Sequence, residues 1–118
     1  METRALRYGL AQNYFDAREY RRAIHELTGI VEHDPQNVSV RMLLARSYYY
    51  AALLAPAEKQ LREVIELDPT ESYAHHMLAR TLERQSRRDE ATKYRRIAAA
   101  LTGNDDLLRP HGAAPTEA

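Results

Sequence analysis

The chain has 118 residues, enough for one domain with a buried core, and 17 Lys and Arg residues balance 17 Asp and Glu residues. A formal net charge of zero argues against a nucleic-acid binder, whose affinity comes from a surplus of cations. The absence of cysteine excludes disulfides and thiolate chemistry, and no apolar run approaches the roughly 18 residues that a membrane-spanning helix needs. Since no signal-peptide pattern opens the chain, we expect a soluble, cytoplasmic protein without a membrane or nucleic-acid partner.

Two amphipathic helical patterns come first, over residues 3–15 and 20–33, with apolar residues at i, i+3 and i+4 spacing. Asp34-Pro35 ends the second helix, because proline lacks a backbone N–H and restricts the residue before it. Gly9 lies inside the first pattern at a cost of about 1 kcal/mol relative to Ala. We therefore expect a close helix contact at Gly9.

Four further helical patterns follow. Their boundaries are marked by residues that favour helix ends, namely Asn37, Pro56, Thr70, Ser86 and Gly103. We expect the Asn, Thr and Ser to cap the third, fifth and sixth helices. The proline suits the first position of the fourth helix, and the glycine ends the sixth.

The composition changes after Gly103. Residues 104–109 (NDDLLR) fit one short helical turn, and residues 111–118 have the small and polar composition of a disordered tail. We therefore expect a helical domain over residues 1–103, then a short helical turn and a flexible C-terminal tail over residues 104–118. The acidic and apolar segment DDLL is expected either to fold over the sixth helix or to dock in a groove of its own or a neighbouring copy.

A period of 34 residues relates the helices in pairs. The positions that recur in register are Leu10, Leu44 and Leu78; Ala11, Ala45 and Ala79; Ala23, Ala57 and Ala91; and Asp34-Pro35 with Asp68-Pro69. A fixed period of this length predicts stacked supersecondary units. With no strand pattern, the expected fold is all-α, an α-solenoid of three antiparallel helix pairs. The recurring alanines would let the two helices of one pair approach closely.

The Leu-Gly/Ala step, the following Tyr, the later Ala and the terminal Pro resemble the tetratricopeptide repeat, a 34-residue helix–turn–helix unit. The resemblance covers residues 4–103 as three repeats. It departs from the pattern where Arg7, Arg41 and His75 replace an early aromatic residue. The third copy also carries Arg95 in place of the apolar residue of the other two. The resemblance implies a superhelix whose first helices line a concave surface that holds segments of partner proteins.

No group of residues indicates catalysis. The chain has no Gly-rich phosphate loop, and its serines lie in helices or caps rather than in a nucleophile elbow. His75 and His76 point about 100° apart on a helix, unlike the i, i+4 ligands of a metal site. We expect no enzyme, no cofactor and no metal. The Arg-rich stretch over residues 84–96 is interpreted as the polar outer face of the last helix.

The exposed sides of the first helices form the candidate peptide-binding surface, because Tyr and Arg are enriched at protein interfaces. The candidate residues are Tyr8, Gln12, Phe15, Met42, Arg46, Tyr49, Tyr50, Tyr73, His76, Arg80 and Arg84. Arg46, Arg80 and Arg84 are the strongest candidates, since a cluster of guanidinium groups suits a carboxylate. Tyr8 and Tyr49 could instead fill crevices between helices.

The expected function is a non-catalytic protein–protein interaction module that binds a partner peptide of acidic and apolar character in the concave groove. The alternative is homo-oligomerisation through uncapped terminal helices or the C-terminal segment. One branch of the resembling family clamps chaperone tails with Lys and Asn residues. The matching places here carry Tyr8, Gln12, Leu43, Tyr73 and Met77. Chaperone tails are therefore not expected partners.

Overall fold

The computed structural model describes residues 3–110, which form six α-helices, one short 3-10 helix and no strand. The elements are α1 (Thr3–Asp16), α2 (Tyr20–His33), α3 (Val38–Tyr50), α4 (Leu54–Leu67), α5 (Ser72–Arg84), α6 (Arg88–Thr102) and η1 (Asp105–Leu108). The tail predicted over residues 111–118 lies outside the described residues. No helix within residues 3–110 combines the length and apolar character needed to cross a membrane.

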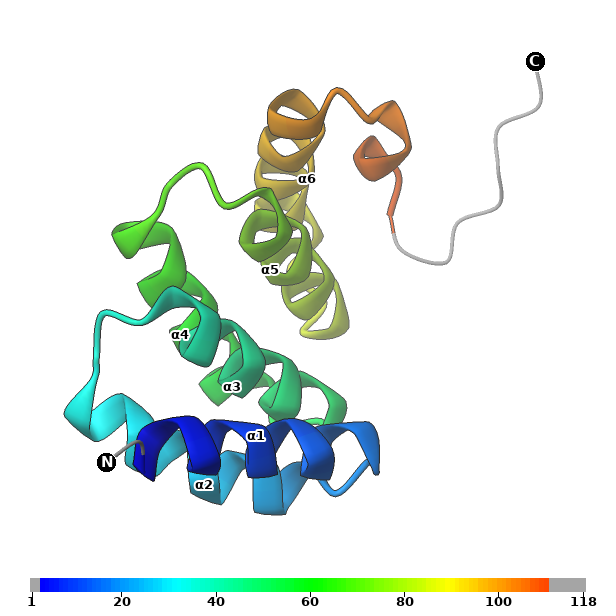
Figure 1. Cartoon of the computed structure of the whole chain (residues 1–118). Coiled ribbons are helices and arrows are strands. Elements are labelled where there is room, and N and C mark those ends of the chain that lie inside the picture. The colour runs from blue at the N-terminus through cyan, green and yellow to red at the C-terminus, as the bar shows by residue number, and fades with distance from the viewer. Residues whose placement is uncertain (1–2, 111–118) are drawn as a thin grey trace.

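The helices pack as three antiparallel hairpins, α1–α2, α3–α4 and α5–α6, stacked in chain order (Figure 1). This arrangement confirms the predicted all-α solenoid. Successive hairpins meet mainly through α2 with α3 and α4 with α5. The first helices also contact one another, α1 with α3 and α3 with α5, whereas the second helices of the described chain do not come comparably close. The stack therefore curves toward α1, α3 and α5, and it measures 55 × 25 × 23 Å.

Buried alanines recur on both helices of every hairpin. The recurring residues Ala11, Ala45, Ala79, Ala23, Ala57 and Ala91 are all between 0% and 1% exposed. Between hairpins, larger side chains fill the space, and Leu27 and Leu61 are fully buried. Because protein interiors are packed as densely as organic crystals, a longer side chain at an alanine position would have to separate the helices.

The turns inside the three hairpins share one backbone conformation. Arg18, Ala52 and Ser86 have φ angles of 61°, 62° and 62°, at the same place in each unit. In the central turn, the Ala52 N–H donates to the Tyr49 carbonyl and the next N–H donates to the carbonyl five residues back, and the other turns repeat this pattern. This is the Schellman motif, whose positive-φ position usually holds glycine. All three turns therefore carry some strain from a Cβ atom.

Polar side chains replace the early aromatic residue of the repeat pattern, and two of them bind the loop that precedes their helix. Arg41 Nε donates to the Pro35 carbonyl at 2.7 Å, and His75 Nε2 lies 2.8 Å from the Pro69 carbonyl. The His75 ring also stacks on Tyr94 at 6.0 Å between centroids. At Arg41 and His75, a hydrogen bond to the loop between units is thus formed from the position where the repeat pattern has an aromatic residue.

Three expected helix starts are wrong by one or two residues. Helix α4 begins at Leu54, so Pro56 is its third residue, still in the first turn where backbone N–H groups have no intrahelical partner. Thr70 does not cap α5, because its hydroxyl donates to Asp68 Oδ1 at 2.8 Å. Ser86 is the positive-φ residue of the third turn, and the residue after it caps α6.

The predicted cap of α3 is confirmed, since the Asn37 side chain accepts a hydrogen bond from the Val40 N–H at 3.1 Å. Gly103, with φ of 72°, ends α6 as predicted. The explanation proposed for Gly9 is wrong, because a Cβ at this position would meet no neighbouring atom within 4 Å. No close helix contact requires glycine at position 9.

The segment after α6 folds back against that helix and not into a groove of its own chain. Arg95, which stands where the other hairpins have Leu27 and Leu61, pairs with Glu83 at 2.6 Å. Arg95 Nε also donates to the Leu108 carbonyl at 3.1 Å. One arginine therefore attaches η1 to the last hairpin and covers the C-terminal end of the solenoid.

We expect Ala57→Leu to lower the free energy of unfolding by about 1–3 kcal/mol, because the added atoms overpack the central hairpin. Thermal or urea unfolding followed by circular dichroism measures the change. Lys59→Leu, at an exposed position of the same helix, is the control and should change stability little. An unaltered unfolding midpoint for Ala57→Leu would contradict the packing described here.

We expect Ala52→Gly to raise the free energy of unfolding by about 0.5–1 kcal/mol, because glycine removes the strain of the positive φ. The neighbouring Ala51 has an ordinary φ of −81°, so Ala51→Gly should lower stability by increasing the freedom of the unfolded chain. Opposite signs for these adjacent substitutions are the expected result. A loss of stability in both variants would show that the turn is unstrained.

Candidate functional site

Most of the predicted site residues lie together on the inner side of the curve, along α1, α3 and α5. Contacts between rings and guanidinium groups join them. We call the surface that they form the first-helix face, and its residues are Phe15, Arg46, Tyr49, Tyr50, Tyr73, His76, Arg80 and Arg84. The helices come from three different units. The face therefore exists only because the units stack.

Arg46 is the central residue of the first-helix face. Its guanidinium carbon lies 4.7 Å from the centre of the Phe15 ring on α1 and 5.7 Å from that of Tyr73 on α5. Each such cation–π contact contributes about 0.5–2 kcal/mol, depending on desolvation. The Arg46 Nε is buried and has no hydrogen-bond partner among residues 3–110. The two rings thus hold the Arg46 guanidinium in place between α1 and α5.

Tyr49 supports two further arginines. Its ring centre lies 5.2 Å from the Arg80 guanidinium carbon and 4.7 Å from that of Arg84. Arg84 Nη1 also donates to the Tyr49 carbonyl at 3.1 Å. Tyr49 itself is only 4% exposed. Of the two roles considered for this residue, the structure shows packing, with the arginines above it at the surface.

A cluster of three aromatic rings adjoins Arg46 at the turn end of α1 and α3. Phe15 lies 5.3 Å from Tyr20 and 5.8 Å from Tyr50, and Tyr20 stacks on Tyr50 at 5.6 Å. Tyr50 remains 43% exposed. Tyr20 was not among the predicted site residues, because helical spacing places it in the apolar stripe of its own helix, α2. No local sequence signal connects it with Tyr50.

Three predicted residues do not join these contacts at the surface. Met42 is 8% exposed and belongs to the central core, so its side chain is not available to a partner. Tyr8 is half-buried against the core of the first hairpin and lines a separate cavity of about 390 Å³ beside Ser39. Gln12 is exposed on α1.

A cavity of about 440 Å³ lies at the C-terminal end of the first-helix face. It is lined by Arg80, Glu83, Arg84, Arg88, Arg95 and Pro110. Sequence reasoning assigned Arg88 and Arg95 to the polar outer face of the last helix. They line a cavity with two predicted site residues because α6 packs on α5, and Pro110, which follows η1, adds to the lining.

The two neighbouring histidines do not form a metal site. His75 is buried with its Nε2 at the Pro69 carbonyl, whereas the His76 ring lies 6.2 Å from Tyr73 on the first-helix face. Within residues 3–110, no three His, Asp or Glu side chains are grouped so that they could hold a metal ion.

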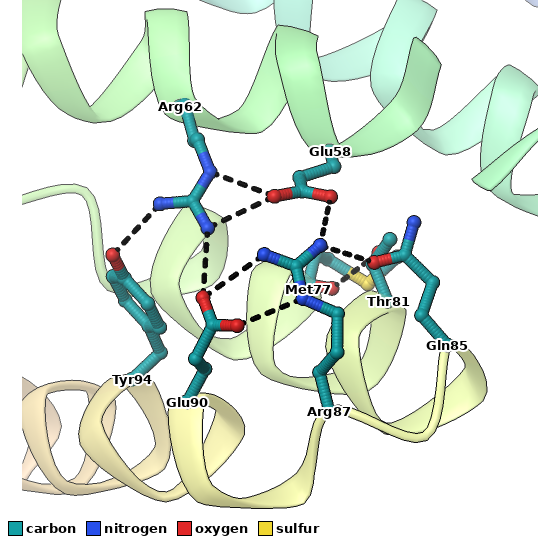
Figure 2. A network of polar contacts seen from close by, with 8 residues as sticks. All are labelled: Glu58, Arg62, Met77, Thr81, Gln85, Arg87, Glu90 and Tyr94. Carbon is teal, nitrogen blue, oxygen red and sulfur yellow. Dashed lines mark hydrogen bonds and ion pairs between the residues drawn. The ribbon is translucent and has the colours of Figure 1, made fainter. Parts of the chain in front are cut away.

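A second polar cluster joins the second and third hairpins (Figure 2). Arg62 on α4 pairs with Glu58 at 2.9 Å and donates to the Tyr94 hydroxyl on α6 at 3.0 Å. Arg87, at the start of α6, pairs with Glu58 at 2.7 Å and with Glu90 at 2.8 Å. The cluster thus connects α4 with α6, two helices that are otherwise separated by α5.

The charges of this cluster are matched. Burial acts to raise the pKa of the Glu58 carboxyl, but hydrogen bonds from Arg87 and Arg62 outweigh it and leave the pKa below its ordinary value. The hydrogen bond from Arg87 likewise lowers the pKa of Glu90. Carboxylates that are held ionised by two guanidinium groups suit a structural link rather than proton transfer.

Comparison with known proteins places these features in a family context. A family model described as tetratricopeptide repeat matches residues 14–80. A solved structure of a MamA point mutant is 23% identical, with a TM-score of 0.81 over 86% of this chain and 74% of the other. The first TPR of Spaghetti (RPAP3), described as bound to the HSP90 peptide SRMEEVD, is 20% identical, with a TM-score of 0.84 over 91% and 85%. No curated protein sequence matches the chain.

A further structure of MamA is 17% identical, with a TM-score of 0.85 over 89% of this chain and 62% of the other. The chain also spans 60% and 59% of the length of two other MamA chains. At these identities, the likeness establishes a shared fold.

We expect Glu58→Gln to reduce the loss of stability in acid. Because the pKa of Glu58 is lower in the folded than in the unfolded chain, its stabilising contribution is complete above about pH 4.3 and is lost as the pH falls through the folded value. Urea unfolding at pH 7, 4 and 3 measures this. The wild type should lose more stability between pH 7 and 3 than the variant does. Glu63→Gln, an exposed carboxylate on the same helix, should behave like the wild type.

Proposed function

Because the chain belongs to the tetratricopeptide repeat family, we propose that it is a non-catalytic protein-interaction module whose first-helix face binds a segment of a partner protein. The observation that carries the proposal is the row of rings and guanidinium groups along α1, α3 and α5. Arg46 alone contacts rings from both neighbouring first helices. The likeness to a chain described as bound to a peptide supports peptide binding by this fold.

The chemistry of the face favours a partner segment that is both acidic and apolar. No carboxylate among residues 3–110 pairs with Arg46 or Arg84, and both guanidinium groups lie on rings. Guanidinium groups bind carboxylates through paired hydrogen bonds, which gives direction as well as affinity. Tyr50 and Tyr73, 43% and 39% exposed, offer ring area for apolar side chains between the acidic ones.

The mechanism is a surface prepared before binding. An arginine side chain that is ordered only on binding costs about 0.5–1.5 kcal/mol in lost rotamer freedom. Here Phe15 and Tyr73 restrain Arg46, and Tyr49 restrains Arg80 and Arg84. Part of this ordering therefore takes place when the protein folds, and a short partner segment can bind without reorganising the face.

The proposed partner differs from the chaperone tail bound by one branch of the family. That branch uses Lys and Asn side chains, whereas the matching positions here include Tyr8, Gln12 and Tyr73, and two others are buried as Leu43 and Met77. The arginines of this chain lie farther along α3 and α5. We therefore propose recognition of acidic side chains within a segment.

We expect Arg46→Glu combined with Arg80→Glu to abolish peptide capture while helicity stays unchanged. The probe is a displayed library of random peptides selected on the wild-type protein, from which sequences rich in Asp, Glu, Leu and aromatic residues should emerge. Titration of a selected synthetic peptide should show at least a tenfold loss of affinity for the variant, or about 1.4 kcal/mol.

Arg21→Glu with Arg96→Glu is the control, because it makes the same change of charge at exposed positions on α2 and α6. It should bind the selected peptide within about twofold of the wild type. Normal binding by the Arg46 and Arg80 variant, or equal loss in both variants, would rule out the first-helix face as the binding site.

A further inference from the structure

The outer side of α1 has the sequence of a buried surface but is open to solvent. Leu6 is 72% exposed, more than any other large apolar side chain among residues 3–110, and Leu10, one helical turn later, is 41% exposed. Ala11 is the only buried residue of α1. Two leucines at i, i+4 spacing form an apolar stripe on one side of a helix. We call this stripe, Leu6 and Leu10, the α1 face.

In the other two units, the equivalent residues are buried against the preceding hairpin. One period later, Val40 and Leu44 are 4% and 2% exposed, and they pack with Leu27 and Ile30 of the preceding hairpin. Another period later, Ala74 and Leu78 are fully buried in the cluster that contains Leu61. The stripe is thus the stacking surface of the repeat. In the described chain, α1 has this surface and no helix against it.

The opposite end of the solenoid does not offer a counterpart. Stacking of α1 on α6 of another copy would require an apolar stripe on α6 like that of α2 and α4. In its place α6 carries Arg95, which is engaged with Glu83 and with the Leu108 carbonyl, and η1 lies against the helix. Head-to-tail association is therefore obstructed. The uncovered stacking surface that a second copy presents is its own α1 face.

The charges beside the α1 face do not oppose such a contact. Arg4 pairs with Asp34 at 3.5 Å, and Arg7 pairs with Glu26 at 3.4 Å. Both arginines are thus partnered by carboxylates of their own hairpin, although these pairs are partly exposed and contribute little to stability. Two α1 faces could approach without placing unpaired cations opposite one another.

We propose that two copies of the chain associate through their α1 faces in a symmetric dimer, with Leu6 and Leu10 of both copies at its centre. A two-fold axis satisfies both copies with the same patch, and the assembly closes at two. The contact buries, in each copy, the stripe whose counterparts on α3 and α5 are buried against α2 and α4. It involves a surface different from the first-helix face, which stays open in both copies.

The contact area sets the strength of this dimer. A helix of 14 residues is about 21 Å long, and one helix pair buries less than the roughly 1,200 Å² of a stable interface. We therefore expect a reversible dimer, mostly monomeric at about 10 μM and mostly dimeric at about 1 mM.

Sedimentation of the full chain across this concentration range tests the proposal. The mass of the wild type should rise from 13.6 kDa toward twice that value. Leu6→Glu combined with Leu10→Glu should remain at 13.6 kDa throughout, with unchanged helicity because neither side chain contributes to the core. Leu101→Glu is the matched control, since this leucine on α6 is 42% exposed, and it should dimerise like the wild type.

The Arg46→Glu, Arg80→Glu variant should also dimerise normally, which separates this proposal from peptide binding. A wild type that stays monomeric at about 1 mM overturns the dimer and would leave the α1 face to a helix of a different protein. Dimerisation of the Leu6, Leu10 variant overturns it as well.

A second measurement tests the symmetry. The chain has no cysteine, so Leu10→Cys introduces a single thiol. Under mild oxidation at high concentration, Leu10→Cys should form a covalent dimer faster than Leu101→Cys, because position 10 lies near the proposed axis. Equal rates at both positions would contradict contact through the α1 face.

Discussion

Each helix pair of this protein can bury its apolar side only by lying against another pair, and this constraint organises the whole structure. Leu27 and Ile30 of α2 are buried by Val40 and Leu44 of α3, and the next interface repeats the arrangement. Inside each pair, both helices carry recurring alanines that are fully buried or nearly so. The strained positive-φ residue recurs at the same place in every turn, because the geometry of the hairpin is set by packing on both of its sides.

Because the stack is curved, its three first helices form one shared surface, the first-helix face, which a single hairpin could not form. Because the first helices contact one another and the second helices do not come comparably close, side chains of α1, α3 and α5 converge on the inner side. There Arg46 lies between rings from two other helices. A row of oriented guanidinium groups and partly exposed rings results, and Arg and Tyr are residue types that are enriched at protein interfaces.

The two terminal helices, α1 and α6, differ in whether their outer side is polar or apolar. At the C-terminal end, Arg95 replaces a buried leucine, pairs with Glu83 and holds η1 against α6. At the other end, α1 keeps Leu6 and Leu10 at positions whose counterparts are buried in the later units. Repeat proteins need a polar outer face at their ends to stay soluble, and only one end of the described chain has it.

The sequence by itself determined the period, the helix pairs, the cap at Asn37 and the alanine contacts, because these depend on spacing along one or two neighbouring helices. It also indicated most of the first-helix face, since repeat register shows which positions of α1, α3 and α5 are equivalent. Only the tertiary structure decided that Met42 lies in the core, that Tyr20 stacks on Tyr50, and that Pro110 and Arg84 line the same cavity. Helical periodicity defines the sides of each helix, but the curvature of the stack and the return of the chain after α6 decide which sides meet.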